Sequence, residues 1–114
     1  MLALAGIYDR WRDPTKLEND PSRWLLSFAI FTKDAAEPLA PIHERNPILL
    51  SESSMTEWLD PDNLEDPENT TQDLLNELAE ESDQVAAVVE SWPVSAEAGN
   101  VRNNSSSLII QLSQ

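Results

Sequence analysis

The amino-acid sequence predicts an α+β fold with a mixed, mostly antiparallel β-sheet and two or three short helices. Short apolar runs of strand length occur near the beginning of the chain, and apolar residues at helical spacing occur near its middle. Clusters of Asp, Pro, Asn and Ser separate these segments. Since the 114 residues contain no internal repeat or linker, residues 1–114 are expected to belong to a single domain.

Two segments in the first third of the chain have the pattern of strands. Residues 2–8 are short and apolar, which favours a buried strand, and residues 12–22 form a polar connection. In residues 24–32, Leu26, Phe28 and Ile30 alternate with Ser27, Ala29 and Phe31. We therefore expect one face of this strand to be fully buried and the other partly buried. Residues 34–37 are expected to form one helical turn that ends before Pro38.

The middle of the chain contains a short strand and two helical patterns. Residues 48–50 suit a strand, and Ser51-Glu52-Ser53-Ser54 suits the start of a helix that Asp60-Pro61 ends. Residues 62–70 have loop composition, and Thr70 or Thr71 can cap a second helix. The apolar stripes of the two helices are Met55, Trp58 and Leu59, and then Leu74, Leu75 and Leu78.

The last third of the chain is less regular. Residues 85–89 suit either a strand or a continuation of the second helix, because a short β-branched run fits both. Residues 107–112 predict a closing strand. Trp11, Trp58 and Trp92 are expected to pack in the core; stacking on unpaired bases is the alternative.

The charge balance is strongly acidic and unevenly distributed. The formal net charge is −14, which argues against nucleic-acid binding driven by net charge, since phosphate neutralisation needs Lys and Arg. Six of the seven basic residues lie in the first 45 positions, whereas residues 52–90 contain thirteen acids and no base. The acidic stretch is best interpreted as a solvated surface, and a partner for it is the alternative. A local basic face around Arg45 and Arg102 could still meet a phosphate backbone.

Composition argues against several other classes. One histidine and no cysteine leave no ligand set for zinc, and the acidic residues lack the spacing of a calcium loop, so no metal and no cofactor are expected. Two glycines cannot build a phosphate-binding loop. No apolar run reaches the length of a membrane span, and no signal peptide opens the chain. A cytoplasmic location is therefore expected.

The segment Ala40-Pro41-Ile42-His43-Glu44-Arg45-Asn46-Pro47 contains the most informative pattern. Histidine is the residue type that changes charge near neutral pH. The two prolines favour an extended backbone, and residues two apart on a strand share a face. His43 and Arg45 are therefore predicted to converge on one anionic group. A solitary histidine in an ordinary loop hydrogen bond is the alternative.

This segment resembles the Ile-His-Asp-Arg-x-Pro signature of the SOS response-associated peptidase (SRAP) family of abasic-site processing proteins. Four other segments match that family in order. They are Leu4-Ala5-Gly6-Ile7-Tyr8-Asp9-Arg10-Trp11, Ser27-Phe28-Ala29-Ile30-Phe31-Thr32-Lys33-Asp34-Ala35, Trp58-Leu59-Asp60-Pro61, and Pro93-Val94-Ser95 with Gly99-Asn100-Val101-Arg102-Asn103. The matches correspond to the C-terminal half of the family's domain, so a barrel-like SRAP fold truncated at its N-terminal half is expected.

The resemblance also implies roles for individual residues. His43 matches the family's catalytic histidine, which acts as an acid or base near the abasic sugar. Arg45 matches an arginine that holds DNA, and Asn100, Arg102 and Asn103 match a segment near the site. Glu44 replaces an aspartate of the family motif. Asn46 replaces an apolar residue of that motif, and this change is expected to loosen local packing.

Other elements of the family's chemistry have no counterpart here. Family members carry a cysteine after the initiator methionine, which links covalently to the ring-opened abasic sugar, together with a catalytic asparagine and glutamate. This chain has no cysteine, and Asp9 is interpreted as a structural acid and not as that glutamate. The resemblance therefore implies abasic-site shielding in single-stranded DNA, with covalent crosslinking and autopeptidase activity lost in this chain alone. The alternative is a non-catalytic remnant that docks a complementary N-terminal half.

Overall fold

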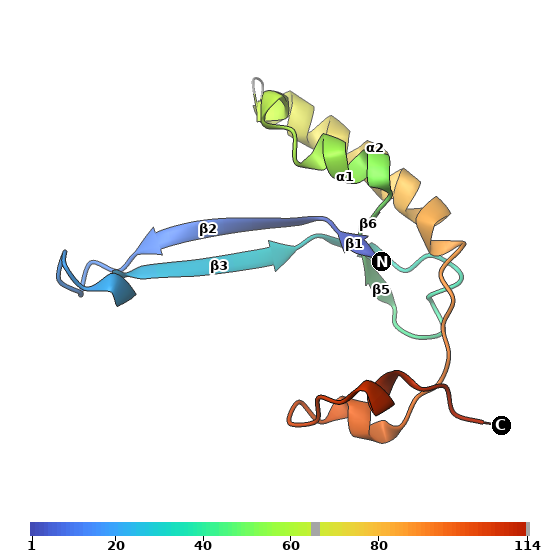
Figure 1. Ribbon diagram of the computed structural model, residues 1–114. Coiled ribbons are helices and arrows are strands. Elements are labelled where there is room, and N and C mark those ends of the chain that lie inside the picture. The colour runs from blue at the N-terminus through green and yellow to red at the C-terminus, as the bar shows by residue number, and fades with distance from the viewer. Residues whose placement is uncertain (65–66, 114) are drawn as a thin grey trace.

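The computed structural model describes residues 1–64 and 67–113, and these residues form an elongated molecule (Figure 1). Its radius of gyration is 18.4 Å, whereas a compact chain of this length has a radius of about 13 Å. The α+β class and the antiparallel pairing of strands are confirmed. Within the described residues, the strands form three two-stranded ladders that do not close into a barrel.

The three ladders meet at one junction. They pair β1 (Ala3–Leu4) with β6 (Leu49–Leu50), β2 (Gly6–Arg12) with β3 (Trp24–Ile30), and β4 (Thr32–Asp34) with β5 (Arg45–Pro47). Backbone hydrogen bonds then join Ala5, Phe31 and Ile48: Ala5 N donates to Ile48 O at 3.0 Å, Phe31 N to Ala5 O at 3.0 Å, and Ile48 N to Phe31 O at 2.9 Å. These hydrogen bonds hold together three segments that are far apart in the sequence.

Two α-helices lie beside this junction. The helix α1 (Glu52–Trp58) begins within the predicted start at residues 51–54, and Ser51 caps it, because its hydroxyl accepts a hydrogen bond from Ser54 N at 3.2 Å. The second helix, α2 (Pro67–Ala86), begins earlier than predicted, with proline at its first position. Residues 67–70 are therefore helical and not loop, although residues 65–66 and the side chains of the predicted caps Thr70 and Thr71 lie outside the described part. Residues 61–64 form a 3-10 turn.

The main core lies between α2, α1 and the ladder junction. Its buried members are Ala5, Ile48, Leu50, Leu74 and Leu78, with Phe31, Met55 and Trp58 packed against them. Trp58 contacts Phe31 edge to face, with 5.7 Å between ring centroids, and its Nε1 donates to Gly6 O at 3.0 Å. The core positions predicted for both helices are therefore largely confirmed, except Leu59, which is exposed.

Several predictions at the periphery are wrong. Residues 24–30 form a strand, but both of its faces are exposed, because in the described residues only β2 pairs with it and nothing covers the pair. The helical turn expected at residues 34–37 is absent, since Asp34 belongs to β4. Residues 85–86 continue α2, and residues 107–112 contain a 3-10 turn in place of a strand.

The tryptophans divide between core and surface. Trp58 packs as predicted, whereas Trp11 and Trp92 are exposed. Trp11 lies on the uncovered β2–β3 pair, and Trp92 lies in the separate C-terminal segment.

Two aspartates shape the turns at the tip of the β2–β3 pair. Asp13 accepts hydrogen bonds from the hydroxyl and N–H of Thr15, at 2.6 and 2.9 Å, and Asp20 accepts the same pair from Ser22, at 2.7 and 2.8 Å. The side-chain bond from Thr15 and then its backbone bond lower the pKa of Asp13 below 3.8, and the bonds from Ser22 do the same for the pKa of Asp20.

These shifts predict a pH dependence confined to the tip. Since each folded pKa is depressed, the turn bonds stabilise the tip above pH 3.8 and are lost as pH falls through the lower folded value. In an NMR titration, the amide signals of Thr15 and Ser22 should move with midpoints below the ordinary pKa of an aspartate. Asp13→Asn should abolish the Thr15 titration and spare that of Ser22. Midpoints at or above that ordinary pKa would contradict the assignment.

Candidate functional site

The segment before His43 is a series of turns. Ala40 N and Leu39 N both donate to Ala36 O, at 2.9 and 2.8 Å, and His43 N donates to Leu39 O at 3.2 Å. The extended geometry predicted from Pro41 therefore does not form. The extended backbone begins only at Arg45, the first residue of β5.

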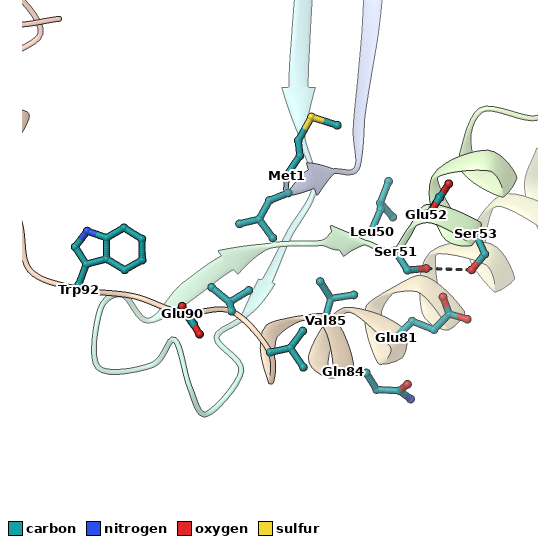
Figure 2. A pocket seen from close by; sticks show the side chains of 13 residues that line it. Met1, Leu50, Ser51, Glu52, Ser53, Glu81, Gln84, Val85, Glu90 and Trp92 are labelled. Atoms are coloured by element: carbon teal, nitrogen blue, oxygen red, sulfur yellow. Dashed lines mark hydrogen bonds between the residues drawn. The ribbon is translucent and has the colours of Figure 1, made fainter. Parts of the chain in front are cut away.

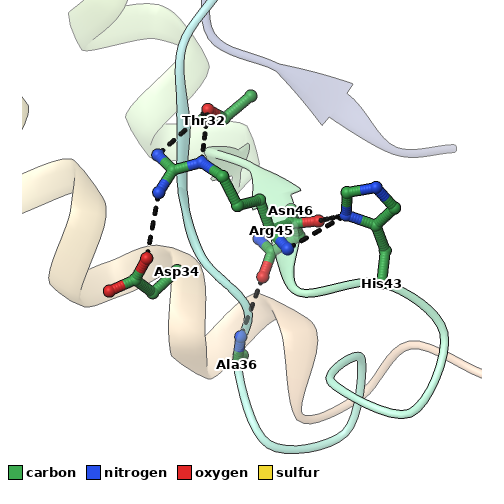
Figure 3. Close-up of polar contacts among 6 residues, drawn as sticks. All are labelled: Thr32, Asp34, Ala36, His43, Arg45 and Asn46. Atoms are coloured by element: carbon green, nitrogen blue, oxygen red, sulfur yellow. Dashed lines mark hydrogen bonds and ion pairs between the residues drawn. The ribbon is translucent and has the colours of Figure 1, made fainter.

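The imidazole of His43 is held by the backbone of Arg45 (Figure 3). Its Nδ1 lies 3.0 Å from Arg45 N and 3.1 Å from Arg45 O. Arg45 N–H donates to Nδ1 in the tautomer that carries its proton on Nε2, and Nδ1 donates to Arg45 O in the other tautomer. The residue is exposed, and Nε2 points away from the other residues drawn. An exposed imidazole fixed in this way can give or take a proton at Nε2.

The guanidinium of Arg45 is held by β4. The register of the two strands sets Arg45 opposite Asp34, and Nη1 lies 2.9 Å from Asp34 Oδ1. Nε and Nη2 donate to Thr32 Oγ1 at 3.2 and 3.1 Å. The side chain of Arg45 remains 47% exposed, so an incoming phosphate can still reach it. Such a phosphate would compete with the Asp34 carboxylate.

The predicted convergence of imidazole and guanidinium is wrong. Figure 3 shows the two groups on opposite sides of the Arg45 backbone, one beside Thr32 and Asp34 and the other beside the turn. The rule that residues two apart share a face applies within a strand, and His43 precedes β5. The structure therefore brings the two residues together through backbone contacts, and each side chain faces a different part of the surface.

Asn46 has a role in the site that the sequence did not indicate. The residue is 5% exposed, and its Oδ1 accepts a hydrogen bond from Ala36 N at 2.8 Å. Its Nδ2 donates to Pro47 O at 2.6 Å. The expectation that Asn46 loosens local packing is therefore wrong, because its amide ties the start of the turns to β5. Its place in the motif, where the family has an apolar residue, was the only signal for this role.

The remaining predicted DNA contacts lie on another segment. Asn100 follows the 3-10 turn η3 (Ala96–Gly99), and its Oδ1 accepts from Arg102 N at 3.0 Å. Asn103 Nδ2 donates to Glu97 O at 2.9 Å. Figure 1 shows this C-terminal segment apart from β5. The structure thus groups Asn100, Arg102 and Asn103 with one another and does not bring them to His43.

Among the hollows formed by the described residues are two near the junction, and neither of these is lined by His43 or Arg45. The larger, of about 930 Å³, lies between the start of α1, the end of α2 and Trp92, and Glu52, Glu81 and Glu90 contribute to its wall (Figure 2). The smaller is bordered by Asp34, the ion-pair partner of Arg45, and by Asp83 of α2. In residues 1–64 and 67–113, no cluster of three His, Cys, Asp or Glu suits a metal ion. Within the same ranges, no helix is both long and apolar enough to cross a bilayer.

Fold and site together define an α+β chain of antiparallel strand pairs that presents a fixed, exposed histidine beside an arginine. Residues 1–101 match the family model for SOS response associated peptidase (SRAP), and the chain belongs to this family. It is 33% identical over 109 residues to abasic site processing protein YoqW of Bacillus subtilis (strain 168), and to the protein of the same name from Bacillus phage SPbeta.

A second Bacillus subtilis relative, abasic site processing protein YoaM, is 30% identical over 109 residues. These alignments cover 96% of this chain and 42% of each relative, so the chain spans less than half the length of the relatives it matches. No solved structure was found to match the chain.

Proposed function

We propose that this chain takes part in the processing of abasic sites in single-stranded DNA. His43 would act as an acid or base at the abasic sugar, and Arg45 would hold the adjacent phosphate. The observation that carries the proposal is the exposed His43, whose Nδ1 is fixed 3.0 Å from Arg45 N within the motif shared with the family. Asn100, Arg102 and Asn103 would contribute further contacts to DNA.

The chemistry available to this chain is narrower than that implied by the family. A covalent thiazolidine link to the abasic sugar needs an N-terminal cysteine, and the sequence contains no cysteine. We therefore propose that residues 1–114 alone bind abasic DNA without covalent capture and without autopeptidase activity. The net charge of −14 predicts weak binding, because few basic side chains are present to neutralise phosphates.

The expected result with an abasic single-stranded oligonucleotide is reversible binding that leaves no shifted band on a denaturing gel. In fluorescence anisotropy at low salt, Arg45→Ala should weaken binding by about tenfold, because one phosphate contact is lost. Arg12→Ala is the matched control, since Arg12 also pairs with an exposed carboxylate, that of Glu18, at 3.1 Å. His43→Ala should reduce the preference for abasic over intact DNA.

Two outcomes would contradict this proposal. A band that survives denaturation would show that the chain captures DNA covalently without cysteine. Equal losses for Arg45→Ala and Arg12→Ala would show that binding depends on charge alone and not on the site.

A second candidate function is that of a non-catalytic piece that docks a complementary part of an SRAP domain. It is favoured by the long β2–β3 pair, whose apolar side chains are exposed although the sequence predicts them to be buried. Both functions can belong to one chain, because the β2–β3 pair and His43 lie on different elements.

A further inference from the structure

The pair of strands β2 and β3, with the loop between them, is called the ribbon here. Its register places cross-strand partners on alternate faces. One face carries Tyr8 opposite Phe28, Arg10 opposite Leu26, and Arg12 opposite Trp24. The other face carries Ile7 opposite Ala29, Asp9 opposite Ser27, and Trp11 opposite Leu25.

Both faces of the ribbon expose large apolar side chains. Tyr8 and Phe28 are 76% and 78% exposed on one face, and Ile7, Trp11 and Leu25 are each more than half exposed on the other. A near-continuous apolar strand such as residues 24–30 is typical of a strand covered on both sides. An isolated two-stranded ribbon is at best marginally stable in water, and exposed patches of this kind mark interaction surfaces.

The edges of the ribbon are open as well. In the described part of the chain, β2 pairs with β3 and neither strand pairs with a third. The outward-facing N–H and C=O groups of both strands can therefore accept a further strand. Figure 1 shows the ribbon extending away from the helices, so the rest of the described chain covers only its base.

The distribution of exposed groups distinguishes between possible occupants. Stacked bases of single-stranded DNA, or the same surface of a second copy in a two-fold dimer, would cover one face and leave the other exposed. A second copy would also bring another charge of −14. Only a polypeptide that supplies strands and packs against both faces removes all of this apolar surface from water.

The size of the relatives points to the source of such a polypeptide. The chain accounts for 42% of the length of YoqW, so more than half of that protein has no counterpart here. We infer that the ribbon is the docking surface for a polypeptide equivalent to this remaining part of an SRAP domain. That polypeptide adds strands to the open edges and buries both faces of the ribbon. The inference rests on the second proposed function and names its surface and partner.

The test mixes the 114-residue chain with a separately produced polypeptide comprising the part of YoqW that the alignment leaves uncovered. Size-exclusion chromatography with light scattering should give a 1:1 complex. Amide hydrogen exchange in β2 and β3 should slow by about tenfold or more in that complex. No DNA is present, so the result is independent of binding at His43 and Arg45.

Matched variants test whether the complex forms through the ribbon. The double substitution Tyr8→Ser with Phe28→Ser should weaken the complex by about tenfold or more, because it removes two central aromatic contacts. The control Val101→Ser with Ile109→Ser removes exposed apolar residues from the C-terminal segment and should leave the affinity unchanged. Unchanged amide protection at Leu78 in both double variants would show that the core remains folded.

Four results would overturn the inference. The first is a complex that leaves amide hydrogen exchange in the ribbon unchanged, and the second is an equal loss of affinity in both double variants. The third is a homodimer that protects the ribbon when the chain is alone. The fourth is protection of the ribbon by an intact single-stranded oligonucleotide. The third would assign the surface to a second copy, and the fourth would assign it to nucleic acid.

Discussion

Leu78→Ala should lower the free energy of unfolding by about 2–5 kcal/mol, the range for truncating a buried leucine. Leu78 is 0% exposed and belongs to the cluster that joins α2 to Ala5, Ile48 and Leu50. Removing its side chain leaves a cavity where the helix meets the ladder junction. Urea denaturation followed by circular dichroism measures the change in the free energy of unfolding. A loss of this size would weaken the packing of α2 against the ladder junction.

Leu59→Ala is the matched control. Leu59 has the same side chain but is 72% exposed at the C-terminal cap of α1. Surface substitutions of this kind usually change the unfolding free energy by less than about 0.5 kcal/mol. A loss at Leu59 comparable to that at Leu78 would mean that the core does not lie between α2 and the junction.

Asn46→Ala should cost about 1–3 kcal/mol, because it leaves the N–H of Ala36 buried without its acceptor. That N–H now donates to Asn46 Oδ1 at 2.8 Å, and both residues are buried. The substitution should also speed amide exchange at Ala36 and weaken abasic-DNA binding, since Asn46 fixes the backbone beside Arg45. Urea denaturation and hydrogen exchange measure the two effects separately.

Asn103→Ala provides the comparison for this prediction. The amide of Asn103 also bonds to a backbone group, Glu97 O, but does so at the surface, where water can replace it. Its loss should change the unfolding free energy by less than about 0.5 kcal/mol. If Asn46→Ala were equally mild, the amide would not be anchoring the turns to β5.

The stability and function of this chain are connected through the ladder junction. The strand β5 that positions Arg45 continues through Ile48 into β6, which packs against α2. Lys33 of β4 also bonds to Ala79 O of α2, at 3.2 Å, and forms an ion pair with Asp83. Substitutions in the core of α2 should therefore disturb the candidate site, although they lie on another element.

The sequence alone determined the local elements whose signals are short-range. Side-chain type and spacing predict the start of α1 at residues 51–54, the apolar stripes of α1 and α2, and the strand at residues 24–30. The motif around His43 likewise identified the family, because its residues are contiguous. Such signals do not depend on contacts with distant segments of the fold.

Only the tertiary structure decided what those elements contact. Burial of residues 24–30 requires a covering layer, which the described chain does not supply, so a pattern typical of a buried strand forms an exposed ribbon. The direction of the Arg45 guanidinium follows from its pairing with Asp34 and Thr32 on β4, eleven and thirteen residues away. Burial and side-chain direction depend on contacts between distant segments, and the local pattern of residues does not encode these contacts.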